Sequence, residues 1–224
     1  GVPFQMNSFL ALLKDDLVIV FLGKILPFAE VGYIGWAKKW AEVPLRLIMD
    51  SVIRVTFPTF SRLQHSKEYL GKAIEKTLFG LAVTMIPISV GLLFFVGPAV
   101  TLIPKYSKWE PALISFFLFV WGAMLAGFST PLTNALNAVG KIKITMMLMI
   151  FWTVVTWILT VILVHLIGFN GFALGLLILA TSLVLVIKVT KQIADFAFIN
   201  QVKWPVVAGL LQAGLYVALR GSAP

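Results

Sequence analysis

Charged residues recur at helical spacing in one stretch of this 224-residue sequence. The stretch carries alternating basic and acidic side chains at Lys39, Glu42, Arg46, Asp50 and Arg54. Residues three and four apart are neighbours on the surface of a helix, so this spacing puts all five side chains on one face. Because the guanidinium fork of arginine matches the oxygens of a phosphate group, the face predicts binding of an anionic group.

A second set of charges lies upstream, at residues 14–16, and adds one more cation. The predicted substrate-binding residues are Lys14, Lys39, Arg46 and Arg54. The predicted charge-pairing or ion-coupling residues are Asp15, Asp16, Glu42 and Asp50. These acids would hold the basic side chains in place or take up a coupling cation.

Residues typical of catalysis, or of metal and cofactor binding, are sparse. The sequence has no cysteine, which excludes a thiol nucleophile and a Cys-based metal site. His65 and His165 lack metal-ligand spacing, and no nucleophile-elbow or phosphate-loop motif occurs. We therefore predict no enzyme activity, no cofactor and no metal site. The enzymatic alternative is a membrane-embedded glycan-lipid transferase whose Asp15-Asp16 pair would bind a metal.

The composition of the chain is that of a membrane protein. Sixty per cent of residues are hydrophobic and 12% are charged, against roughly a quarter charged in soluble domains. Residues 77–104, 111–140 and 144–187 contain no Asp, Glu, Lys or Arg. A span needs about 20 apolar residues, so the third stretch holds two. We predict an all-α polytopic bundle of about seven transmembrane helices, at residues 5–25, 31–58, 74–103, 111–136, 143–166, 171–189 and 204–219.

The distribution of lysine and arginine predicts an orientation. Three loops on one side, after the second, fourth and sixth helices, carry nine basic residues, and the other side carries four. By the positive-inside rule the nine face the cytoplasm, so the net charge of +9 needs no nucleic-acid partner. We expect residues 1–190 to form a six-helix bundle. Residues 191–224 are then a cytoplasmic connector and an additional transmembrane helix.

Three interpretations of the charged helices remain open. In the first, the charges form an ion-pair ladder that only fixes helix packing. In the second, the helix at 31–58 lies flat in the membrane interface. In the third, which we favour, the charges line a hydrated, cationic groove, because ionisable groups at membrane depth persist where they face water or a partner.

Prolines and glycines inside the predicted helices also allow two interpretations. Pro44, Pro87 and Pro131 each remove a helix hydrogen bond and favour a kink. Four glycines accompany them, at positions 80, 91, 122 and 127. The residues are either bend points for gating or small residues that let helices pack closely.

Several short motifs resemble those of a known family when they are taken in order. They are EVGY at 30–33, GWAKKW at 35–40, PTFSR at 58–62, NAVGK at 137–141 and GFNGFA at 168–173. Together they resemble the O-antigen and capsule polysaccharide flippases, within the MATE-like multidrug/oligosaccharidyl-lipid/polysaccharide exporter superfamily. The resemblance covers most of the chain.

The resemblance implies two six-helix bundles that open alternately to the two faces of the bacterial inner (plasma) membrane. The implied substrate is an oligosaccharide linked by pyrophosphate to a polyprenyl lipid. Basic residues in the central cavity, here Lys14, Lys39, Arg46 and Arg54, would meet the pyrophosphate. The chain would be the C-terminal bundle of a longer protein, and its partners would be membrane lipids and a missing N-terminal bundle. The alternative transport function is a multidrug/cation antiporter of the MATE type, in which the acids would matter more.

Overall fold

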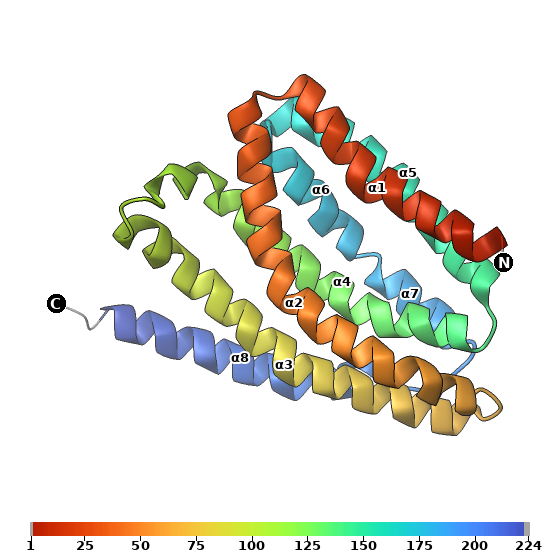
Figure 1. The fold of residues 1–224 in the computed structure, drawn as a ribbon. Helices are drawn as coiled ribbons and strands as arrows, with labels where there is room; N and C mark the ends of the chain where they lie inside the picture. The colour runs from red at the N-terminus through yellow and green to blue at the C-terminus, as the bar shows by residue number, and fades with distance from the viewer. Residues whose placement is uncertain (1, 222–224) are drawn as a thin grey trace.

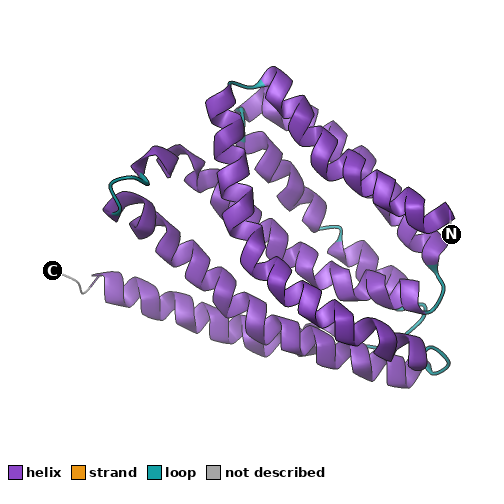
Figure 2. Ribbon diagram, in the orientation of Figure 1, coloured by secondary structure: helices purple, strands orange, loops and turns teal. Residues whose placement is uncertain are grey.

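The protein is built from helices joined by short loops (Figure 2). The structure, a computed structural model, describes residues 2–221, and no strand occurs among them. The elements are α1 (Val2–Ile25), α2 (Phe28–Arg62), α3 (Lys67–Leu102), η1 (Ser107–Ala112), α4 (Leu113–Ala138), α5 (Ile142–Ile167), α6 (Asn170–Ala180), α7 (Leu183–Thr190) and α8 (Phe198–Gly221). The predicted all-α membrane bundle is confirmed.

Five helical segments are long and apolar enough to cross a membrane. They are Lys67–Leu102, Ser107–Ala138, Ile142–Ile167, Asn170–Thr190 and Phe198–Leu219. The other two long helices, α1 and α2, carry the charges noted above and run beside these five (Figure 1). The protein is therefore a multi-pass membrane protein, and the crossing of α1 and α2 stays a prediction.

Each of the seven predicted helices is found in its place, with some differences in extent. α3 begins at Lys67 rather than at residue 74 because Ser66 caps it, its side chain accepting a hydrogen bond from the Tyr69 amide at 3.4 Å. The sixth predicted helix is divided into α6 and α7 by a turn at Thr181 and Ser182. A turn at Gly168 and Phe169 separates α5 from α6, and Gly168 adopts there a φ of 68° that favours glycine.

The helices form three groups (Figure 1). α1 packs along α5, which in turn packs on α6. α4 lies in the centre, where it contacts α2, α3, α6 and α7. α3 and α8 pair on the side away from α1. α1 and α2 are joined by a tight turn but make few contacts with each other, so a space opens between them.

Two of the four glycines singled out in the sequence lie at helix contacts. A Cβ on Gly122 would meet the Leu177 Cα at 3.5 Å, and one on Gly127 would overlap the side chain of Met85. Gly80 and Gly91 have nothing within 4 Å. The helices that contain Pro44, Pro87 and Pro131 continue through them. Close packing therefore accounts for Gly122 and Gly127.

Candidate functional site

A cavity of about 920 Å³ opens between α1 and α2 against the face of α4. Its floor on α4 is made of small side chains, which keep the space open. The ionisable residues that line it are Lys14, Asp15, Asp16, Lys38, Glu42, Arg46 and Asp50. The two charged stretches of the sequence thus face one cavity in space.

A smaller chamber of about 260 Å³ adjoins this cavity. The two share charged residues from both helices: Lys14, Asp15, Lys38 and Glu42. From there the chamber runs between α4, α5 and the break between α6 and α7. Its wall outside the larger cavity includes Ser129, Thr133, Trp152 and Ser182, and Thr130 lines both.

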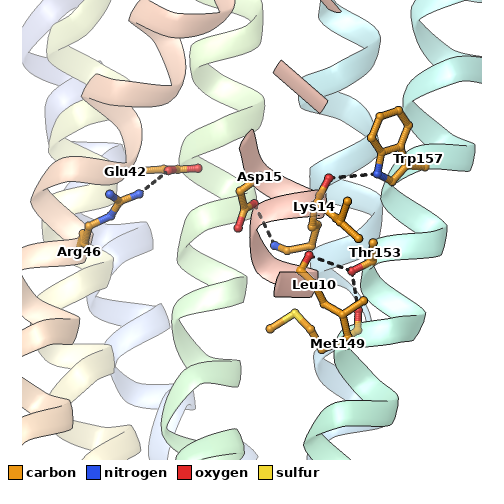
Figure 3. Close-up of polar contacts among 9 residues, drawn as sticks. Leu10, Lys14, Asp15, Glu42, Arg46, Met149, Thr153 and Trp157 are labelled. Carbon is orange, nitrogen blue, oxygen red and sulfur yellow. Dashed lines mark hydrogen bonds and ion pairs between the residues drawn. The ribbon is translucent and has the colours of Figure 1, made fainter. Parts of the chain in front are cut away.

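The position of α1 is set by two hydrogen bonds from α5 (Figure 3). Thr153 Oγ1 shares its proton between the carbonyl of Met149 in its own helix, at 2.8 Å, and that of Leu10, at 3.3 Å. Trp157 Nε1 donates to the carbonyl of Leu13 at 3.1 Å. These bonds hold the turn of α1 that leads into Lys14, whose Nζ lies 3.1 Å from Asp15 Oδ1. α5 therefore presents the charges of α1 to the cavity.

The charges of α2 form one ion pair rather than a continuous ladder. Arg46 Nη2 lies 3.2 Å from Glu42 Oε2, and the Arg46 side chain is 68% exposed. Among residues 2–221, Asp50 makes no ion pair with Arg46 or with Arg54. An exposed pair of this kind contributes only about 0–1 kcal/mol. The interpretation as an ion-pair ladder is therefore supported by one ion pair on α2.

The structure brings together two of the four predicted binding residues. Lys14 and Arg46 line the cavity, whereas Lys39 and Arg54 are exposed and are not among its lining residues. Lys38, which sequence reasoning left out, lines both chambers, and its Nζ lies 5.8 Å from the centroid of the Phe172 ring. The signal for it was present, since Lys38 lies one helical turn, four residues, before Glu42.

All four predicted acids line the larger cavity. They are Asp15, Asp16, Glu42 and Asp50. They face the three bases Lys14, Lys38 and Arg46, so four negative charges oppose three positive ones. The groove expected to be cationic is therefore mixed in sign. In the described part of the chain, no group of three or more His, Asp or Glu side chains is placed to hold a metal ion.

The helices that carry the charges of this cavity are also matched in comparison with known proteins. The sequence model of a family described as "Polysaccharide biosynthesis protein" matches residues 1–114, half of the chain. The chain belongs to this polysaccharide biosynthesis family. The match covers α1, α2 and α3, and so includes every ionisable residue of the cavity. It confirms the resemblance to polysaccharide flippases drawn from the sequence motifs.

A similar protein whose name also refers to polysaccharide biosynthesis supports the family assignment. The succinoglycan biosynthesis transport protein ExoT of Rhizobium meliloti (strain 1021) is 27% identical over 94 residues. The alignment covers 42% of this chain and only 19% of that protein. No solved structure matches. One protein to which this chain is similar is thus named for transport.

Proposed function

We propose that this protein takes part in moving a polyprenyl-pyrophosphate-linked oligosaccharide across the bacterial inner membrane by alternating access. The observation that carries the proposal is the cavity between α1 and α2. The cavity has a volume of about 920 Å³ and is lined by ionisable side chains from two helices. The other helices of the bundle are apolar enough to span a membrane. Ionisable groups persist at membrane depth where water or a ligand meets them.

The proposed substrate explains why a charged cavity is needed. A sugar-pyrophosphate head group cannot cross hydrocarbon unaided, because its polar groups would lose water without compensation. Lys14 on α1, and Lys38 and Arg46 on α2, supply donors for phosphate oxygens from both sides of the cavity. The prenyl tail would stay in the bilayer while the head group passes through the cavity.

The acidic residues of the cavity have a separate role in this proposal, which is ion coupling. With four carboxylates against three cations, a pyrophosphate enters a site that is slightly negative. Uptake of a proton or a cation by the acids would remove this repulsion. We therefore propose that Asp15, Asp16, Glu42 and Asp50 couple substrate binding to an ion.

A second bundle completes the proposed transporter. In an alternating-access mechanism, the cavity of one bundle opens to either membrane face as it moves against the other. The chain supplies one bundle, α1 to α7, and the helix α8 beside α3. The partner bundle would cover the open side of the cavity between α1 and α2.

Two adjacent lysines provide a sharp test. Lys38→Gln removes a cation from the cavity, whereas Lys39→Gln removes one from the exposed side of α2. We expect export of the lipid-linked glycan by the intact protein in cells to fall strongly in Lys38→Gln and to be retained in Lys39→Gln, at equal protein levels. The reverse order would favour the assignment made from sequence spacing. Normal export by both variants, and by Arg46→Ala, would contradict the proposal.

The excess of acids specifically favours one alternative, a multidrug/cation antiporter. A site with four carboxylates and three bases could hold an organic cation. In that case cells with the intact protein would show drug efflux that is lost in Asp15→Asn or Asp50→Asn and kept in Arg46→Ala. Glycan export would be unaffected by any of the three.

A further inference from the structure

The smaller chamber has charged residues only on the side that it shares with the larger cavity. At its mouth stand the two bases and two acids that it shares with the larger cavity. Its other lining residues, from α4, α5 and the α6–α7 break, include no charged side chain. A ligand that reaches past the mouth therefore meets neutral groups only.

One of these neutral groups is an indole in a fixed orientation. Trp152 Nε1, on α5, donates to Ser182 Oγ at 2.8 Å. Ser182 lies in the turn that separates α6 from α7, so this bond ties the broken segment to α5. Because the N–H of Trp152 is already used, the indole offers a ligand its apolar ring.

The other polar groups of the chamber, whose remaining lining is apolar, are hydroxyls that can form further hydrogen bonds. Ser129, only 8% exposed, makes no side-chain hydrogen bond within residues 2–221. Thr130 and Thr133 donate to α4 carbonyls at 3.2 and 2.9 Å, which leaves their oxygens free to accept. Ser182 accepts from Trp152 and keeps its own proton to donate. Buried hydroxyls normally have a partner, so a ligand with polar groups fits here.

An aromatic ring beside neutral hydroxyls is the chemistry that recognises a sugar ring. The C–H face of a sugar packs on an indole, and its hydroxyls both donate and accept. We propose that the smaller chamber binds the sugar next to the pyrophosphate, with Trp152 against the ring and Ser129 and Ser182 as hydrogen-bonding partners. The inference rests on the proposed function, since the charges at the mouth would hold the pyrophosphate. A volume of about 260 Å³ suits one sugar ring.

Binding to the intact protein in lipid nanodiscs tests this assignment. The probes are a short-chain polyprenyl pyrophosphate, either bare or bearing one glucose, galactose or N-acetylglucosamine. We expect wild type to prefer at least one sugar-bearing probe over the bare one by roughly tenfold, the scale of a buried aromatic contact. Trp152→Leu should abolish this preference. Trp152→Phe should keep most of it, and Ser129→Ala should reduce it.

The outcomes separate this inference from the proposed function. If wild type binds the bare probe but prefers no sugar, or if the preference survives in Trp152→Leu and Ser129→Ala, the sugar site is wrong and the proposed function stands. Lys38→Gln should weaken binding of bare and sugar-bearing probes alike. If wild type binds no probe at all, the proposed function fails and the sugar site fails with it.

Discussion

The backbone amide of Ala197 donates a hydrogen bond to Glu75 Oε1 at 2.7 Å. This bond joins the connector before α8 to the first part of α3. The Asp195 amide also donates to the Lys67 carbonyl at 3.3 Å, and Gly71 lies directly against the Asp195 backbone. The connector is therefore held against two turns of α3. The helix α8, which follows it, packs along the same helix.

The contact at Gly71 predicts a steric effect on stability. A Cβ there would overlap the carbonyl of Asp195, so Gly71→Ala must displace the connector. We expect a loss of about 1–3 kcal/mol, as for other overpacked sites. The matched control is Gly80→Ala, because Gly80 lies in the same helix with nothing within 4 Å. Thermal unfolding in detergent measures both, and equal melting temperatures would contradict the contact.

The bond at Glu75 predicts a different result for two substitutions. Glu75→Ala leaves the half-buried Ala197 amide without its acceptor, which costs about 0.5–1.5 kcal/mol, the net worth of one hydrogen bond. Glu75→Gln retains a side-chain oxygen and should lose much less. Limited proteolysis within the connector, residues 191–197, should accelerate in Glu75→Ala alone. Identical cleavage of the two variants would show that the bond does not hold the connector.

The attachment of α1 to α5 predicts opposite effects for two threonines on α5. Thr153→Val removes the hydroxyl that Met149 and Leu10 share, and with it the bond to α1, so it should destabilise by about 1 kcal/mol. Thr156 is 1% exposed, and its Oγ1 has no hydrogen-bond partner in the described part of the chain. Thr156→Val should therefore be neutral or stabilising. Hydrogen exchange in α1 should speed up in Thr153→Val only; faster exchange in both would contradict the contact.

The charge balance of the cavity predicts that removing an acid strengthens anion binding. Asp50→Asn leaves three acids and three bases around the cavity. We expect the affinity for a polyprenyl pyrophosphate to rise by about three- to tenfold, as Coulomb's law gives for one exposed charge at several ångströms. Glu68→Gln, at the start of α3 outside the cavity, is the control. A weaker affinity in Asp50→Asn would mean that the acid itself supports the bound head group.

The sequence predicted the helices well because long charge-free stretches leave few alternatives. It did not predict the break at Thr181 and Ser182, since neither residue is a proline or glycine and the flanking residues are uniformly apolar. Trp152, which donates a hydrogen bond to Ser182 in this break, lies 30 residues away on α5, so no local sequence pattern connects the two residues. Only packing reveals the smaller chamber.

The choice between Lys38 and Lys39 shows a second limit. Either residue is near enough to one helical turn before Glu42 to share its face, three or four residues away. What decides between them is which side of α2 packs on α4 and faces α1, and this depends on the tertiary fold. The predicted acids needed no such choice, and all four line the cavity.

Whether water reaches the cavity is the central claim, and the absence of cysteine allows a direct measurement. Single cysteines at positions 46, 50 and 47 of the intact protein would be treated in cells with a membrane-impermeant thiol reagent, from each side of the membrane. Arg46 and Asp50 line the cavity, whereas Leu47, 66% exposed, is not among its lining residues. The account predicts labelling at 46 and 50, from at least one side, and none at 47. Absence of labelling at both 46 and 50, or equal labelling at all three positions, would contradict it.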